Sequence, residues 1–255
     1  RIRRYYRTHV PLTRQARAAT ALNPGNGWVS RLCHDPRVAL AVLHEMLAPF
    51  ELNGQLVLMP HCRLIAAHTH HDRVRSTVVK DLESGLDCLI EAPFFVVATP
   101  LGDLLALAGV EHDIGAESRS ETGEPHASEH ADSRAQQAIT VCFAMEHLSG
   151  ENHTIDKPPQ YKFWRDYVPP AWPGRLFSWT TVRPETLLPL SRGLFESDDG
   201  KPWWTFRRIL DRKNFRNGFA ESDVTIVNWP LNDYWLGPIC GVDESEQARN
   251  VQAAR

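Results

Sequence analysis

Residues 94–109 read Phe-Phe-Val-Val-Ala-Thr-Pro-Leu-Gly-Asp-Leu-Leu-Ala-Leu-Ala-Gly, and this stretch constrains the fold more than any other. Its first five residues are apolar on both faces of an extended segment, which predicts a strand covered on both sides. Gly102 and Asp103 then form a turn, and residues 104–108 predict a short helix that ends at Gly109. Ligands of open α/β sheets bind at such turns. This turn offers backbone N–H groups and one carboxylate, which suit a ribose or a water-bridged phosphate; an ordinary turn is the alternative.

Three short runs that favour strands precede this stretch, with tight turns between them. They are residues 62–68, 73–81 and 88–92, and His70-His71-Asp72 is one of the turn groups. Short strands with tight links predict an antiparallel meander.

A helix is predicted to begin at Pro36. Asp35 can cap its first turn, and a proline costs nothing at the first helical position. Apolar residues recur every four positions as one stripe, at Val38, Val42, Met46 and Phe50. Asn53-Gly54 ends the helix.

The chain beyond residue 109 mixes strands, loops and helices. Residues 111–135 predict a polar excursion, and residues 152–202 predict a folded cap or substrate segment. The remaining predictions are strands at 138–145 and 223–229, a helix at 203–215, a loop at 232–234 and a C-terminal helix from about 246.

Composition limits the function classes. The 255 residues include 28 basic and 31 acidic side chains, for a net charge of −3. We expect no nucleic-acid partner, because no basic footprint is present, and no membrane span, because no apolar run is long enough. The five cysteines are scattered singly without a C-x-x-C, which favours small buried thiols in a reducing cytoplasm.

A glycine pattern at residues 25–30 matches G-x-G-x-x-[GAS]. The dinucleotide-binding form of this pattern requires a strand before it and a helix that opens at it. Here Asn23-Pro24 precedes the glycines and the helix begins only near Asp35. A glycine-rich loop is therefore predicted.

Histidines and nucleophiles supply two further candidate sites. One histidine group comprises His61, His68, His70 and His71, and another comprises His112, His126 and His130. A zinc site needs three or four converging ligands, and no H-E-x-x-H occurs, so a solvated hairpin tip is predicted, with a histidine–zinc hydrolase as an alternative. The chain has no G-x-S-x-G elbow. Cys33 is next to His34, but adjacent residues rarely present both groups to one substrate.

The order of elements, together with four blocks of residues, resembles the FAD-dependent oxidoreductases of the glutathione-reductase-like superfamily. More narrowly, it resembles the bacterial group known simply as FAD-dependent oxidoreductase. The blocks are residues 23–34, 98–109, 122–125 and 228–234. The resemblance covers essentially the whole chain, and the A-T-x-x-G-D-L-x-x-L-A-G run is its most specific part for the wider family.

The resemblance implies an α/β fold in two parts. Residues 1–110 would be part of an FAD-binding Rossmann-like domain with its antiparallel β-meander, and residues 111–255 a β-rich substrate or cap region. It implies FAD as the cofactor and hydride transfer between a small organic substrate and the flavin. The family's strand-borne G-x-G-x-x-G belongs upstream of Arg1 and a closing flavin-contact segment belongs downstream of Arg255, so we expect an internal fragment that is inactive alone.

The resemblance also implies which residues contact the cofactor. Leu64 occupies the strand position that meets the adenine through backbone groups. The turn after the apolar strand passes the cofactor, which nominates Ala98, Thr99, Gly102 and Asp103. Pro100 stands where glycine is common in the wider family, so one backbone N–H is lost there.

Catalytic residues are not fixed by the resemblance, because the flavin carries the difficult chemistry. Arg31 and His34 are the first hypothesis, since their loop immediately precedes the capped helix. Arg31 would hold an anionic substrate and His34 would move a proton. Asp233 and Tyr234, after a predicted strand, are second candidates. A surface or capping role is the alternative for each.

The rival from another function class is a non-enzymatic carbohydrate-binding or structural segment. It is argued from the eight tryptophans, which crowd the second half of the chain, and from the predicted strands. Core packing explains the tryptophans equally well.

Overall fold

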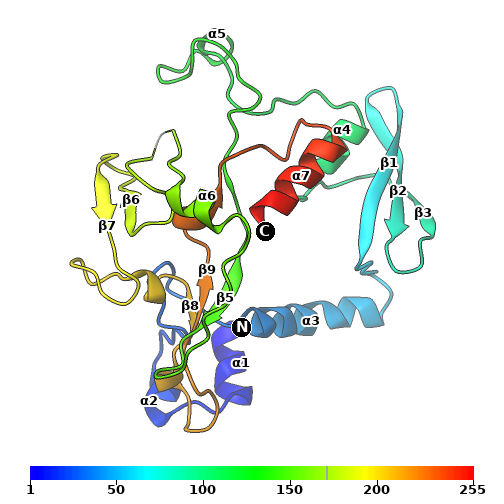
Figure 1. The fold of residues 1–255 in the computed structure, drawn as a ribbon. Helices are drawn as coiled ribbons and strands as arrows, with labels where there is room; N and C mark the ends of the chain where they lie inside the picture. The colour runs from blue at the N-terminus through cyan, green and yellow to red at the C-terminus, as the bar shows by residue number, and fades with distance from the viewer. Residues whose placement is uncertain (171) are drawn as a thin grey trace. The chain divides into compact units, whose positions relative to one another are not determined.

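The computed structural model of the chain describes residues 1–170 and 172–255 (Figure 1). These residues divide into two compact units. Unit 1 comprises Arg1–Pro49, Ala138–Gly237 and Val251–Arg255, and unit 2 comprises Phe50–Gln137 and Pro238–Asn250. This division groups residues by contact, so the boundary at residue 110 between a cofactor domain and a cap region stays a prediction. Helices and several antiparallel sheets make the fold a mixed α/β one, consistent with the predicted class.

The meander predicted for unit 2 is confirmed. Strands β1 (Cys62–His70), β2 (Arg73–Asp81) and β3 (Asp87–Glu91) form one antiparallel sheet in that order, drawn in cyan in Figure 1. Helix α4 (Asp103–Leu107) packs against β1. Its bounds confirm the short helix predicted before Gly109.

The prediction of a strand at residues 94–98 is wrong. These residues form no strand, and the side chains of Phe94 and Val96 are 85% and 91% exposed. A strand needs a neighbour that takes its N–H and C=O groups. The apolar side chains of this run favour a strand that is covered on both sides. In the described part of the chain, however, no segment pairs with the run.

The polar excursion of unit 2 folds locally and is tied to the start of the last helix. It contains the one-turn helix α5 (Arg119–Thr122), in which Glu121 and Ser118 form a reciprocal capping box. Helix α7 (Glu244–Ala254) confirms the predicted C-terminal helix. Arg134 and Glu246 form an ion pair at 2.8 Å, which joins the end of the excursion to α7.

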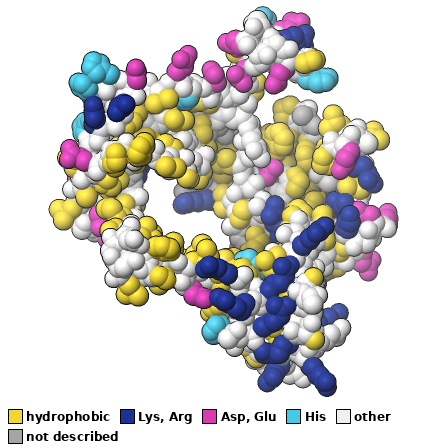
Figure 2. Space-filling model, turned by 180° about the vertical axis from the view of Figure 1, so that it is seen from behind, with side chains coloured by type: hydrophobic (Ala, Val, Ile, Leu, Met, Phe, Trp, Pro, Cys, Tyr) yellow, Lys and Arg dark blue, Asp and Glu magenta, His cyan; other side chains and the backbone are white. Residues whose placement is uncertain are grey.

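Unit 1 begins with helices α1 (Ile2–His9) and α2 (Arg14–Ala18), near the bottom of Figures 1 and 2. Lys and Arg side chains gather in that part of Figure 2, because residues 1–34 hold seven arginines and no acidic residue. Several of these arginines bind backbone carbonyls. Arg3 donates to Leu22 O at 2.8 Å and Arg7 donates to Ala19 O at 2.7 Å, so they close the loops after the helices.

Helix α3 (Pro36–Leu52) begins and ends as predicted. The backbone N–H of Arg37 donates to Asp35 Oδ1 at 2.8 Å, which confirms Asp35 as the capping residue. Val42 is buried, whereas Met46 and Phe50 are 37% and 50% exposed. Only the first half of the apolar stripe is therefore covered.

The rest of unit 1 contains short paired strands, and some of these pairs join segments far apart in sequence. Strands β5 (Phe143–Glu146), β9 (Val224–Val227) and β8 (Arg208–Leu210) form one antiparallel sheet. Strands β4 (Ile139–Thr140) and β10 (Asp233–Tyr234) form a second, and β6 (Thr180–Val182) and β7 (Pro189–Ser191) a third. Helix α6 (Tyr161–Asp166) lies in the segment predicted to form a folded cap.

Three predictions for this region need correction. The strand predicted at 138–145 is two strands, because β4 pairs with β10 while β5 pairs with β9. The helix predicted at 203–215 is wrong: β8 pairs with β9 there, and 3₁₀ turns at Trp203–Thr205 and Arg212–Asn214 flank it. The predicted loop at 232–234 ends in β10, after a 3₁₀ turn at Pro230–Asn232.

Two apolar clusters stabilise unit 1. One consists of Tyr6, Leu12, Ala16, Leu22 and Phe215, and the other of Trp203, Val227, Trp229 and Leu231. Trp203, Trp204 and Trp229 are at most 7% exposed, so core packing accounts for these three tryptophans.

Of the five cysteines, only Cys33 is buried as predicted, and Cys88 and Cys142 are exposed. None of the helices in residues 1–170 and 172–255 has the length and apolar character needed to cross a bilayer.

Candidate functional site

The candidate site is a cavity of about 980 Å³ in unit 2, open to solvent. Its walls come from β1, β2, the turn before α4, the excursion and the start of α7. The apolar part includes Leu64, Leu105, Leu107, Ile114 and Val242, and the polar part includes Arg63, Lys80, Asp103, Gln136 and Gln247. Apolar and polar groups share the lining, which suits a small molecule that carries both apolar and polar parts.

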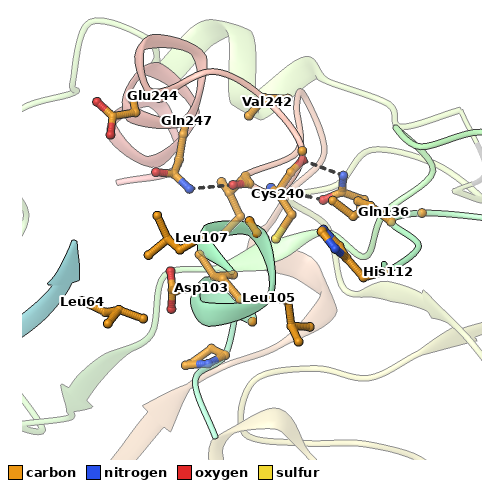
Figure 3. A pocket seen from close by; sticks show the side chains of 18 of the residues that line it. Leu64, Asp103, Leu105, Leu107, His112, Gln136, Cys240, Val242, Glu244 and Gln247 are labelled. Carbon is orange, nitrogen blue, oxygen red and sulfur yellow. Dashed lines mark hydrogen bonds between the residues drawn. The ribbon is translucent and has the colours of Figure 1, made fainter. Parts of the chain in front are cut away.

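Three of the five residues predicted to contact the cofactor line this cavity. They are Leu64, Gly102 and Asp103. Figure 3 shows Leu64 on its strand and Asp103 at the start of the short helix. Leu64 and Asp103 both reach the cavity because α4 packs on β1. These two segments are about forty residues apart in the chain, so no local sequence pattern predicts their contact.

The turn before α4 has a defined geometry. Gly102 adopts a left-handed conformation with φ of 66°, which favours glycine. The backbone N–H of Asp103 donates to Thr99 Oγ1 at 3.1 Å, so Thr99 fixes the turn from outside the cavity lining. Ala98 is exposed and does not line the cavity. The structure therefore gives Thr99 a positioning contact and gives Ala98 none.

The opposite wall is built by amide side chains that sequence reasoning missed. Gln136 Nε2 donates to Cys240 O at 2.9 Å and Gln136 Oε1 accepts from Cys240 N at 3.4 Å, as a paired strand residue would. Gln247 Nε2 donates to Ile239 O at 2.7 Å (Figure 3). Glutamines in these positions belong to no motif, so only the tertiary structure reveals them.

Arg31 and His34, predicted as catalytic, lie in the loop before α3 in unit 1. The Arg31 side chain is exposed, and its carbonyl accepts from Arg3 Nη2 at 3.0 Å. His34 is half-buried, with Nδ1 3.0 Å from Asp35 O. This placement leaves the Arg31 guanidinium accessible and holds the His34 ring by one nitrogen.

Asp233 and Tyr234 lie on β10 of unit 1. Burial raises the pKa of Asp233 above its usual value, and the hydroxyl of Thr140, which donates to this carboxylate, opposes that shift. Burial also raises the pKa of Tyr234, whose ring lies 6.0 Å from that of Trp164. In the described residues no hydrogen bond or ion pair joins Asp233 to Arg31 or His34. The structure does not bring the two catalytic hypotheses together.

The histidine groups form no metal centre in the described residues. His70 and His71 are exposed at the β1–β2 turn with their ring centroids 4.2 Å apart, a solvated hairpin tip. Within residues 1–170 and 172–255, no three His, Cys, Asp or Glu side chains gather where they could hold a metal ion.

The glycine pattern at residues 25–30 is a loop that packs against β8, as predicted. A Cβ on Gly25 would lie 1.9 Å from Arg208 O, so the glycine permits a close approach of two backbones.

Comparison with known proteins places the sequence in a family. No curated protein and no solved structure matches the chain. The sequence profile of a family described as FAD dependent oxidoreductase matches residues 2–255, which is nearly the entire chain. That family has FAD as its cofactor. The chain therefore belongs to the FAD-dependent oxidoreductase family.

Proposed function

We propose that the protein transfers a hydride between a small organic substrate and the flavin of FAD. The observation that carries the proposal is the unit 2 cavity, which gathers Leu64, Gly102 and Asp103, three residues predicted to contact this cofactor. Membership of the FAD-dependent oxidoreductase family supports it. The glutathione-reductase-like, Rossmann-like arrangement belongs to the same proposal and is supported by the meander β1-β2-β3.

The residues present fit the adenosine part of FAD. The cavity of about 980 Å³ lies near the upper end of the roughly 300–1,000 Å³ typical of small-molecule sites. In the proposed site the backbone of Leu64 contacts the adenine and the Asp103 carboxylate accepts from ribose hydroxyls. Gly102, in the left-handed region, keeps the turn free of a side chain there.

FAD, when bound, supplies the group that takes or gives the electron pair. The chain's own residues then have to bind the substrate and move a proton. In the proposed mechanism the exposed Arg31 guanidinium binds an anionic substrate, and His34 moves a proton through its free ring nitrogen. Asp233 is the second candidate for proton transfer, because burial keeps its carboxyl protonated to a higher pH than an ordinary aspartate.

The visible spectrum of the purified full-length protein tests the proposal. We expect a flavin spectrum, with free FAD in the supernatant after heat denaturation. Anaerobic addition of a panel of small organic donors should then bleach the flavin band, and a donor deuterated at the oxidised carbon should bleach it more slowly. A colourless protein that also refuses added FAD would contradict the proposal, and the carbohydrate-binding interpretation would take its place.

A further inference from the structure

Two basic residues lie directly opposite each other on neighbouring strands at the cavity. Arg63 on β1 is the register partner of Lys80 on β2, and both line the cavity. Directly opposed residues of an antiparallel pair project to the same face, where like charges destabilise the sheet. Such a pair is tolerated where other groups neutralise the charge.

The two cations differ in their partners. Lys80 Nζ forms an ion pair with Asp87 at 2.5 Å and donates to Gly85 O at 3.4 Å. The Arg63 side chain makes no hydrogen bond or ion pair with any residue in the described part of the chain. Its guanidinium is the cation at this wall that is available to a ligand.

A bulge in β1 follows Arg63 and Leu64 at the cavity. Arg63, Leu64 and Ile65 are consecutive and all line it, although successive side chains of a regular strand point to opposite faces. The register shifts between Leu64 and Ala66, which marks a bulge. Bulges redirect side chains and are frequent beside binding sites.

Charge is separated around the cavity. The cations Arg63 and Lys80 come from the sheet, while the carboxylates Asp103, Asp113 and Glu244 come from the helices and the excursion. None of these carboxylates forms an ion pair with Arg63 in the described residues. The arrangement fits a ligand with an anionic group at one end and hydroxyl donors at the other, which is the chemistry of a nucleoside phosphate.

We infer that Arg63 binds a phosphoryl group of the adenosine diphosphate part of the cofactor. The inference rests on the proposed FAD site and adds a residue that the family resemblance did not nominate. The guanidinium fork matches two phosphoryl oxygens. Arg63 determines affinity for the charged ligand, while Leu64 and Asp103 contact its uncharged parts.

Isothermal titration of the purified protein with FAD, ADP and adenosine tests this role. Arg63→Gln removes the charge and keeps a shorter polar side chain. We expect it to weaken FAD and ADP binding by about tenfold to a hundredfold and to leave adenosine binding unchanged. The affinity of Arg63→Lys for FAD and ADP should fall between those of the wild type and Arg63→Gln, because lysine keeps the charge but lacks the forked guanidinium. Arg75→Gln, at an exposed position of the same hairpin outside the cavity, is the matched control and should bind all three ligands like the wild type.

The outcomes separate the inference from the proposed function. Equal binding of FAD and ADP by wild type and Arg63→Gln overturns the inference while the proposed FAD site stands. Parallel losses of ADP and adenosine binding also overturn it, since the side chain would then shape the cavity rather than bind phosphate. A wild-type protein that binds ADP but not FAD overturns the proposed function, and the ADP titrations still decide the role of Arg63. Binding of neither nucleotide overturns both.

Discussion

The hydroxyl of Tyr6 accepts a hydrogen bond from the backbone N–H of Asp35 at 3.0 Å. Tyr6 is 2% exposed and belongs to one apolar cluster of unit 1. This bond fixes the residue that caps α3 and the loop that carries Arg31 and His34. The side chain of a residue in α1 therefore positions the predicted substrate-binding loop.

Tyr6→Phe should destabilise unit 1 by about 1–2 kcal/mol, because the Asp35 N–H loses its acceptor. All eight tryptophans lie in unit 1, so urea unfolding followed by tryptophan fluorescence reports on this unit. Tyr5→Phe, at the neighbouring half-buried position, is the control and should unfold like the wild type. Equal midpoints for Tyr6→Phe and the wild type would contradict the structural role.

The same variant tests a pH dependence. Burial raises the pKa of Tyr6 from 10.0 to about 12, because the ionised phenol is poorly solvated. A folded pKa above the unfolded one means that the contribution of Tyr6 is complete below pH 10.0 and is lost as the pH rises through about 12. We expect the stability gap between wild type and Tyr6→Phe to shrink over this window. A difference in stability between the two proteins that grows as the pH rises would contradict the prediction.

Substitution of Asp211 should also lower the stability of unit 1. Its carboxylate accepts from Asn26 Nδ2 at 2.8 Å and from Arg208 Nη2 at 2.9 Å, and it is 4% exposed. Asp211→Asn leaves the half-buried Arg208 with Asp223 as its one counter-charge among the described residues. We expect a loss of about 2–4 kcal/mol in urea unfolding. Asp166→Asn removes two exposed ion pairs, with Arg165 and Arg175, and should cost at most about 1 kcal/mol. Similar losses of stability for Asp211→Asn and Asp166→Asn would refute the distinction.

Gly25→Ala should also destabilise unit 1. The added Cβ would lie 1.9 Å from Arg208 O, so the loop or β8 must move, at a cost of about 1–3 kcal/mol. Gly174→Ala is the matched control, because no atom lies within 4 Å of its added Cβ. Thermal unfolding of the two variants should separate them clearly, and a Gly25→Ala protein as stable as Gly174→Ala would show that the two backbones are not closely packed.

Asp233→Asn should make the protein more stable at neutral pH. Burial raises the pKa of Asp233 above 3.8, so the protonated form is favoured by folding. The wild-type contribution is therefore present below pH 3.8 and lost as the pH rises through the folded pKa. The urea midpoints of the wild type and Asp233→Asn should differ more as the pH rises across this range. Asp198→Asn, at an exposed position, is the control and should unfold like the wild type. An Asn variant less stable than wild type at neutral pH would mean that the carboxylate is stabilised as an ion.

Asp103→Asn tests the cavity itself. Loss of the carboxylate should weaken FAD binding about tenfold, because hydrogen bonds to a charged acceptor contribute more than neutral ones. Flavin fluorescence titration measures the change. Asp72→Asn, at the exposed hairpin tip, should bind FAD normally, and equal affinities for all three proteins would remove Asp103 from the site.

Local signals in the sequence predicted several elements correctly. The pair Asp35-Pro36 and the stop at Asn53-Gly54 predicted α3, and the tight turns predicted the meander. Gly109 predicted the end of α4. Each of these depends on backbone preferences of neighbouring residues, which act in any fold.

Local signals failed where a distant partner decided the structure. Residues 203–215 could form a helix, yet β8 pairs with β9. Residues 94–98 have a composition typical of a strand but no partner in the described chain. The energy of strand pairing depends on a second segment, and the composition of one segment does not identify its partner.

The sequence by itself determined the family signature at residues 98–109, the cofactor class that follows from it, and the identity of Leu64, Gly102 and Asp103 as candidates. Only the tertiary structure decided that these three share one cavity, that Gln136 and Gln247 close its other wall, and that Arg63 lines it opposite Lys80. The physical reason is the range of the forces. Capping, turn and helix preferences act over a few residues, whereas packing of α4 on β1 and strand register depend on segments brought together only when the chain folds.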